Sequence, residues 1–146
     1  MPIYLDYNAT TPVAPEVCQA ISESLQHHFG NPSSSHSLGQ AAKESIDRAR
    51  IQVAAMIGAD DSEILFTSGG SESNNMAIKG LLHQNSSEPG HLIISAIEHP
   101  ATVEPANYLQ RWGIQVTVVG CNTSGVIDVE EIENAIQPNT RLVSIM

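Results

Sequence analysis

A glycine- and serine-rich segment at residues 66–75 has the composition of an anion-binding loop. Gly69 and Gly70 would let the backbone approach a ligand closely. The first N–H groups of the helix expected to follow would be free to donate hydrogen bonds to an anion, and Ser71 and Ser73 add hydroxyl donors. The spacing matches neither the dinucleotide-binding glycine pattern nor the Walker sequence. The segment therefore predicts a phosphate site of another class, and a tight turn with a serine cap is the alternative.

A histidine, His99, follows a short apolar run at residues 92–94 and precedes a predicted helix. Open α/β sheets bind ligands at the carboxyl ends of their strands. A histidine there can stack on a flat cofactor or move protons near neutral pH. A capping or surface histidine is the alternative. We expect His99 on the same sheet edge as Gly70, facing an open cleft.

The other residues of reactive type are better explained by structure than by chemistry. Asn8 lies in a polar segment at residues 6–12, where it is expected to support a turn, and the polar loop at 30–36 is of the same kind. His27 and His28 lack the spacing of metal ligands. Glu130 and Glu131 stand at a predicted helix start, where acidic side chains complement the helix dipole.

The two cysteines show no sign of activation. Cys18 falls on the apolar face of a predicted helix, so we expect it in the core. Cys121 falls in a predicted turn, with no residue nearby that is basic enough to activate it as a nucleophile. Two distant cysteines fit a reducing compartment, and with no signal peptide recognised at the N-terminus they indicate the cytoplasm.

The periodicity of apolar residues predicts an α/β fold. Helical spacing is found at residues 15–29, 38–57, 72–84, 100–112 and 128–136, and short apolar runs typical of buried strands at 64–66, 92–94, 116–119 and 142–146. Asp128, followed by Glu131, has the spacing of a capping box. The alternation of strands and helices predicts a mostly parallel sheet flanked by helices, with right-handed crossovers.

Composition excludes two classes of partner. The chain has 146 residues, 41% of them hydrophobic, and a formal net charge of −10. So acidic a chain is a poor partner for nucleic acid or an anionic membrane surface. No apolar run approaches the ~20 residues of a membrane span.

Four motifs in order resemble the cysteine desulfurases. They are D-Y-N-A-T-T-P at residues 6–12, G-N-P-S-S at 30–34, F-T-S-G-G-S-E-S-N-N at 66–75 and E-H-P at 98–100. These enzymes depend on pyridoxal phosphate and belong to the class V aminotransferase group, with selenocysteine lyases as close relatives. The resemblance covers the whole chain.

The resemblance implies a fold, a reaction and a set of site residues. The fold would be the type I pyridoxal-phosphate transferase fold, with residues 1–14 in the small domain at the active-site entrance and 15–146 in the large cofactor-binding domain. The reaction would convert L-cysteine to L-alanine and leave persulfide sulfur on a homodimeric enzyme. A scaffold protein could accept that sulfur for iron–sulfur clusters or thio-cofactors. Gly70 and Ser71 would bind the cofactor phosphate, His99 would stack on the pyridine ring and transfer protons, and Asn8 would line the entrance.

The sequence departs from the family in what it lacks. In the family, the cofactor-binding lysine, the aspartate on the pyridine nitrogen, the substrate-binding arginine and the sulfur-accepting cysteine lie further downstream. The two lysines, Lys43 and Lys79, fall in predicted helices, and Lys79 is expected to point away from a phosphate held two turns earlier. The chain therefore resembles the N-terminal third of a desulfurase and is expected to be inactive alone.

Three alternatives remain open. The chain could be a non-catalytic α/β scaffold or assembly module. It could belong to a selenocysteine lyase, a cysteine sulfinate desulfinase or another class V relative. An unrelated α/β phosphate-binding protein is the third, and the four ordered motifs disfavour it.

Overall fold

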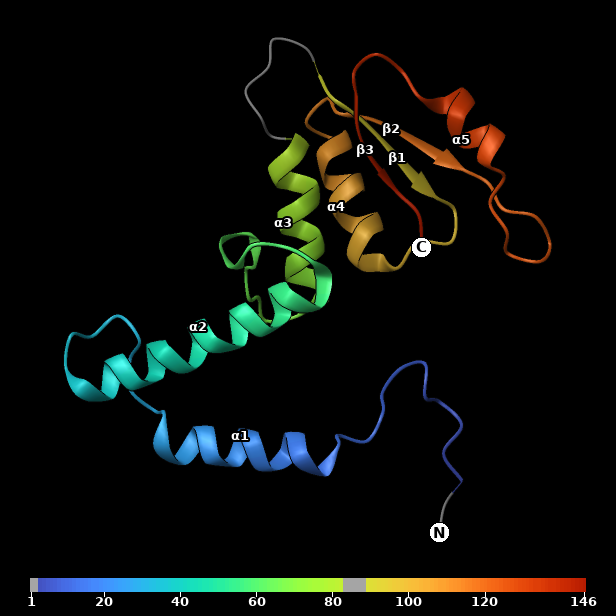
Figure 1. Cartoon of the computed structure of the whole chain (residues 1–146). Helices are drawn as coiled ribbons and strands as arrows, with labels where there is room; N and C mark the ends of the chain where they lie inside the picture. Colours follow the sequence, from blue (N-terminus) through green and yellow to red (C-terminus); the bar gives the residue numbers. More distant parts are fainter. Residues whose placement is uncertain (1–2, 83–88) are drawn as a thin grey trace. The chain divides into compact units, whose positions relative to one another are not determined.

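Residues 3–82 and 89–146 are described by a computed structural model, in which the chain divides into two units, Met1–Phe66 and Thr67–Met146 (Figure 1). Five helices, one short 3₁₀ helix and three strands are found in the described residues. The predicted helix at 72–84 runs past the first described range, so its last two residues lie outside the described residues. None of the described helices combines the length and apolarity that crossing a membrane requires.

The first unit is built from two helices, α1 (Pro15–His27) and α2 (Ser37–Ile57), followed by the 3₁₀ helix η1 (Asp61–Glu63). Pro15 occupies the first turn of α1, where its missing N–H costs nothing. His36 caps α2 by accepting a hydrogen bond from the backbone N–H of Gly39 on Nδ1, at 3.3 Å. Gly58 ends α2 in the left-handed conformation, with φ of 68°, which a glycine adopts without strain. Pro15 and Gly58 thus mark the start of α1 and the end of α2 as predicted, whereas α1 ends at His27, two residues before the predicted end at 29.

Two sequence predictions in this unit are wrong. Residues 64–66 form no strand: Ile64 is extended, with φ of −96° and ψ of 123°, but in the described residues this segment has no strand beside it to complete a ladder. Cys18 is exposed and not in the core, because no residue of α1 is buried. Cys18 shares a helix face with Val17 and Ile21, and within the described residues of the first unit this face remains exposed.

The second unit is a three-stranded parallel sheet with helices on both faces. The strands are β1 (His91–Ser95), β2 (Gln115–Val119) and β3 (Thr140–Ser144), in the order β2-β1-β3. The helices α3 (Gly70–Leu82) and α4 (Pro100–Gln110) lie on one side of the sheet and α5 (Val129–Ala135) on the other (Figure 1). Three of the four predicted strands are present, and the α/β prediction with a parallel sheet is confirmed.

The core of this unit lies between β1 and the helices α3 and α4. All five residues of β1 are buried, and Leu92 and Leu109 have no exposed surface. Burying a leucine side chain contributes about 1.5–3 kcal/mol relative to leaving it in water. The buried cluster comprises Ile78, Leu82, Leu92, Ile94, Ala106 and Leu109. It holds α3 and α4 against the central strand.

Asp128 caps α5 as predicted, although not as a full capping box. Its side chain accepts a hydrogen bond from the backbone N–H of Glu130 at 3.0 Å, and Glu130 precedes the position that a capping box uses. Glu130 and Glu131 stand in the first turn of α5, where they complement the helix dipole as expected.

Polar side chains tie both ends of β1 to the neighbouring strands. At the amino end, His91 is fully buried, with Nδ1 2.8 Å from Thr140 Oγ1 of β3 and Nε2 2.8 Å from Thr117 Oγ1 of β2. A neutral imidazole has one donor and one acceptor nitrogen, and each hydroxyl can take either role. Both hydrogen bonds are therefore satisfied without a charge on the ring.

At the carboxyl end, a carboxylate joins β1 to β3. Ser95 Oγ donates to Glu98 Oε1 at 2.9 Å, and Ser144 Oγ donates to Glu98 Oε2 at 3.4 Å. Because Glu98 immediately precedes His99, these bonds also fix the start of the turn that carries this histidine.

The burial of His91 predicts a loss of stability in acid. Burial disfavours the charged ring and lowers the pKa of His91 from its ordinary value of 6.5. The unfolded chain therefore binds this proton more readily than the folded chain does. The free energy of unfolding is at its full value above the pKa that His91 has in the unfolded chain. It decreases as the pH falls from that value through the lower pKa of His91 in the folded chain. Proton NMR should show the His91 ring titrating below 6.5, and urea unfolding should give a lower free energy of unfolding at acidic than at neutral pH.

Replacement of His91 should remove part of this pH dependence. In His91→Gln the acid-induced decrease should be smaller, whereas the exposed control His27→Gln should retain it. An unchanged decrease in His91→Gln would show that another group causes it.

Candidate functional site

The glycine- and serine-rich segment opens α3, as its composition predicts. α3 begins at Gly70, and the backbone C=O of Gly69 accepts hydrogen bonds from the N–H groups of Glu72 and Ser73, both at 3.1 Å. The Glu72 carboxylate accepts from the backbone N–H of Ser68 at 2.6 Å. Hydrogen bonding to Ser68, from its side chain first and from its backbone second, lowers the pKa of the Glu72 carboxyl group. Residues 64–67 have no regular secondary structure and Ser68 and Gly69 form a bend, so α3 follows a loop and not a strand.

Three donors at the start of α3 remain available to a ligand. In the described part of the chain, the backbone N–H groups of Gly70 and Ser71 and the Ser71 hydroxyl make no hydrogen bond. Cβ atoms placed on Gly69 and Gly70 would meet no other atom within 4 Å, so the space beside these residues is open. Free N–H groups at the positive end of a helix dipole fit an anion such as a phosphate.

His99 caps α4. Its Nδ1 accepts a hydrogen bond from the backbone N–H of Ala101 at 3.0 Å, while the residue as a whole is exposed. The capping role that sequence reasoning held as the alternative is therefore present. Since Nδ1 accepts, the proton of the neutral ring lies on Nε2, which leaves Nε2–H as the group that can meet a ligand.

Ser71 and His99 line the same cavity. Its volume is about 400 Å³, and its wall includes Ser71, Asn75 and Lys79 of α3 and His99, Glu104 and Tyr108 of α4. A volume of this size lies within the ~300–1,000 Å³ range of small-molecule sites. The structure thus brings together the phosphate-loop serine and the histidine that the sequence placed at one sheet edge.

The expectation that Lys79 points away from this site is wrong. Lys79 lines the cavity, and its Nζ lies 4.8 Å from the centroid of the Tyr108 ring. Ser71, Asn75 and Lys79 are spaced by four residues, so they share one face of α3 although about 12 Å separates the ends of the row. The distance along the helix from Ser71 to Lys79 does not by itself show that the two residues share a face.

The other predicted residues belong to the first unit. Asn8 is exposed in a turn of the first unit, where the backbone C=O of Asp6 accepts from the N–H of Ala9 at 3.1 Å. The loop at residues 30–36 is held by local bonds, including one from Ser33 N–H to Asn31 Oδ1 at 2.9 Å. Lys43 is exposed and paired with Asp47 at 3.0 Å, as expected of a solvated lysine. No cluster of three metal-ligating side chains is found in the residues that the structure describes.

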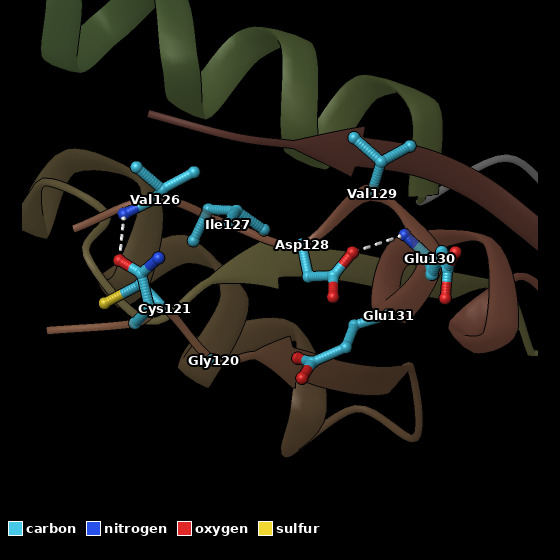
Figure 2. A pocket seen from close by; sticks show the side chains of 9 residues that line it. Gly120, Cys121, Val126, Ile127, Asp128, Val129, Glu130 and Glu131 are labelled. Carbon is cyan, nitrogen blue, oxygen red and sulfur yellow. Dashed lines mark hydrogen bonds between the residues drawn. The ribbon is translucent and has the colours of Figure 1, made fainter. Parts of the chain in front are cut away.

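A second cavity, of about 690 Å³, lies beside α5 (Figure 2). It is lined by Cys121 and by three carboxylates, those of Asp128, Glu130 and Glu131. None of its lining residues is basic. This cavity contains none of the residues predicted to hold a cofactor.

Comparison with known families and proteins places the chain in a family. The sequence model of the family Aminotransferase class-V matches residues 3–146. The chain is 44% identical over 144 residues to the cysteine desulfurase IscS of Dictyoglomus turgidum, which covers 99% of this chain and 36% of that protein. It is 48% identical over 149 residues to the cysteine desulfurase IscS of Pseudomonas syringae pv. tomato, which covers 100% of this chain and 37% of that protein. The chain thus spans little more than a third of the length of these relatives.

Two solved structures are similar to the chain. A NifS-like protein aligns with a TM-score of 0.94 at 36% identity, over 100% of this chain and 40% of that one. A structure described as SspA in complex with cysteine aligns with a TM-score of 0.90 at 43% identity, over 97% of this chain and 41% of that one.

The capping bond of His99 can be tested by stability. Replacing an N-cap side chain with alanine costs about 1 kcal/mol, because one helix N–H loses its acceptor. His99→Ala should therefore lower the free energy of unfolding by about 1 kcal/mol, whereas His99→Asn should restore most of it. Chemical denaturation followed by the fluorescence of Trp112, the single tryptophan, measures both. Equal stability of wild type and His99→Ala would contradict the capping bond.

Proposed function

The chain belongs to the class V aminotransferase family, and from this premise we propose that it forms the phosphate-binding part of a pyridoxal-phosphate-dependent cysteine desulfurase. The observation that carries the proposal is the shared cavity, in which the donors of Ser71 and the ring of His99 line one wall. The relatives named cysteine desulfurase, and a similar structure described as a complex with cysteine, support cysteine as the substrate.

The residues present fit a phosphorylated cofactor. The backbone N–H groups of Gly70 and Ser71 and the Ser71 hydroxyl are unpaired in the described residues, and the space beside the glycines is open. These donors would hold the phosphate. Pyridoxal phosphate, when bound, withdraws electrons from the substrate Cα, which is the chemistry that releases sulfur from cysteine.

His99 would contribute through one side of its ring. While Nδ1 accepts from the N–H of Ala101, Nε2 carries the ring proton and would donate a hydrogen bond to the ligand, and the ring face would be free to stack on the pyridine. For His99 to move a proton through Nε2, Nδ1 would have to carry the other ring proton and release the cap. Protonation of the neutral ring at Nδ1 would break the cap, so proton exchange and the geometry of α4 are linked at this residue.

The remaining elements of the proposal concern the longer protein. We assign residues 1–14, with Asn8, to the active-site entrance and 15–146 to the large domain. The whole enzyme would be a cytoplasmic homodimer that passes persulfide sulfur to a scaffold protein. The downstream residues would decide between cysteine, selenocysteine and cysteine sulfinate as substrate.

Removal of the Ser71 hydroxyl tests the phosphate site. A hydrogen bond to a charged group contributes roughly 1.5–3 kcal/mol, so Ser71→Ala should weaken binding about tenfold or more. Pyridoxine 5′-phosphate is the suitable probe, because it lacks the aldehyde that would react with Lys43 or Lys79. Isothermal titration gives its Kd, and the exposed Ser124→Ala is the matched control.

Two results would contradict the phosphate site. Wild-type protein that fails to bind the probe would show that these donors do not form a cofactor site. An equal Kd for wild type and Ser71→Ala would show that the phosphate binds elsewhere.

The chain alone should not catalyse desulfuration. Pyridoxal chemistry uses a lysine that binds the cofactor covalently and moves the Cα proton. Lys43 is paired with Asp47, and Lys79 lies over Tyr108. With pyridoxal phosphate and cysteine added, sulfide release should not exceed that of the free cofactor, while a complete desulfurase serves as the positive control. Catalytic release that Lys79→Ala abolishes would contradict this expectation and make Lys79 a catalytic residue.

A further inference from the structure

A single hydrogen bond connects α3 to α4 in the part of the chain that the structure describes. Asn74 Nδ2 donates to Thr102 Oγ1 at 3.3 Å. Thr102 is 3% exposed and Asn74 is half-buried, so little water competes for the bond. The backbone N–H of Thr102 in turn donates to the C=O of His99 at 2.8 Å. A hydrogen-bonded path thus runs from the α3 side chain to the residue that caps α4.

The position of this bond relates it to the cavity. Asn74 follows Ser71 by three residues and Thr102 follows His99 by three, so each partner lies about 4.5 Å, or nearly one turn, beyond the residue on the cavity wall. The two helices run in the same direction, and both begin at the carboxyl edge of the sheet (Figure 1). The cavity wall continues along α3 to Lys79 and along α4 to Tyr108, so the bond lies level with the cavity and joins the same two helices as Ser71 and His99.

The apolar contacts between α3 and α4 stabilise the helix pair, and the hydrogen bond adds a directional constraint on their axial offset. Ile78 of α3 packs in a cluster with Ala106 and Leu109 of α4. Such burial stabilises the pair but has no preferred direction. A hydrogen bond has a narrow range of length and angle, so it favours one offset along the helix axes.

We propose that Asn74 and Thr102 are positioning residues, which set the separation of Ser71 and His99 to the length of a pyridoxal phosphate. This inference rests on the proposed function. A ligand that spans both residues requires the correct separation, whereas a ligand held by the Ser71 donors alone does not.

Two probes and matched variants test the proposal. Pyridoxine 5′-phosphate reaches both helices, and inorganic phosphate reaches only the start of α3. Thr102→Val keeps the side-chain shape and removes the hydroxyl, and Thr102→Ser keeps the hydroxyl. Ile78→Val removes a buried methylene group from the same helix pair and is the control for a general loss of packing. Titration calorimetry on the 146-residue chain gives both dissociation constants.

The expected result is a split between the probes. In Thr102→Val, the Kd for pyridoxine 5′-phosphate should rise about fivefold, the effect of one ordinary hydrogen bond, and the Kd for inorganic phosphate should not change. Thr102→Ser and Ile78→Val should bind both probes like wild type. Asn74→Ala should match Thr102→Val, and the double variant should bind no more weakly than either, because both changes remove the same bond.

Several results would overturn the proposal. Unchanged binding of pyridoxine 5′-phosphate by Thr102→Val would show that the bond does not set the separation. An equal loss for both probes, or the same loss in Ile78→Val, would show a general structural role. If Ser71→Ala weakens the binding of pyridoxine 5′-phosphate and Thr102→Val does not, the positioning inference alone fails. If Ser71→Ala has no effect, the proposed function fails as well.

Discussion

The burial of β1 between two parallel neighbours is the constraint on which the candidate site depends. All five residues of this strand are buried, so each of its polar groups needs a hydrogen-bond partner. The backbone groups pair with β2 and β3, and the two polar side chains at the ends of the strand have partners of their own. His91 bonds to β2 and β3, and Ser95 bonds to Glu98, which also accepts from β3. Because the carboxyl end of β1 is fixed, the residue after Glu98 emerges at a defined point, and that residue is His99.

The same topology brings the free hydrogen-bond donors of the start of α3 to this edge of the sheet. α3 and α4 precede β1 and β2 in a parallel sheet, so both helices begin at the carboxyl edge and direct their positive dipole ends there. A chain with a net charge of −10 repels phosphate at long range. The attraction must therefore come from local donors, which are the free groups of Gly70 and Ser71. A cavity shared with His99 then suits a ligand with a phosphate at one end and a flat ring at the other.

The sequence predicted what depends on local chemistry and failed where long-range packing decides. Pro15 and Gly58 marked helix ends correctly, because capping preferences act within a few residues. Residues 64–66 have strand-like composition, but a strand exists only beside a partner that composition does not reveal. Cys18 was assigned to the core from its helix face, and nothing in the sequence shows whether that face is covered. The orientation of Lys79 could have been predicted from its spacing to Ser71, which places both on one face.

The central claim, that the start of α3 and His99 form one phosphate-cofactor site, is tested most directly by amide NMR. Pyridoxine 5′-phosphate is added to the ¹⁵N-labelled chain, and the amide shifts of Gly70, Ser71 and Ala101, which is bonded to His99, are followed. The account predicts that all three titrate with one Kd while residues around the second cavity, such as Cys121, do not shift. The account would be contradicted if only amides around the second cavity changed their chemical shifts. It would also be contradicted if the amide of Ser71 shifted and that of Ala101 did not.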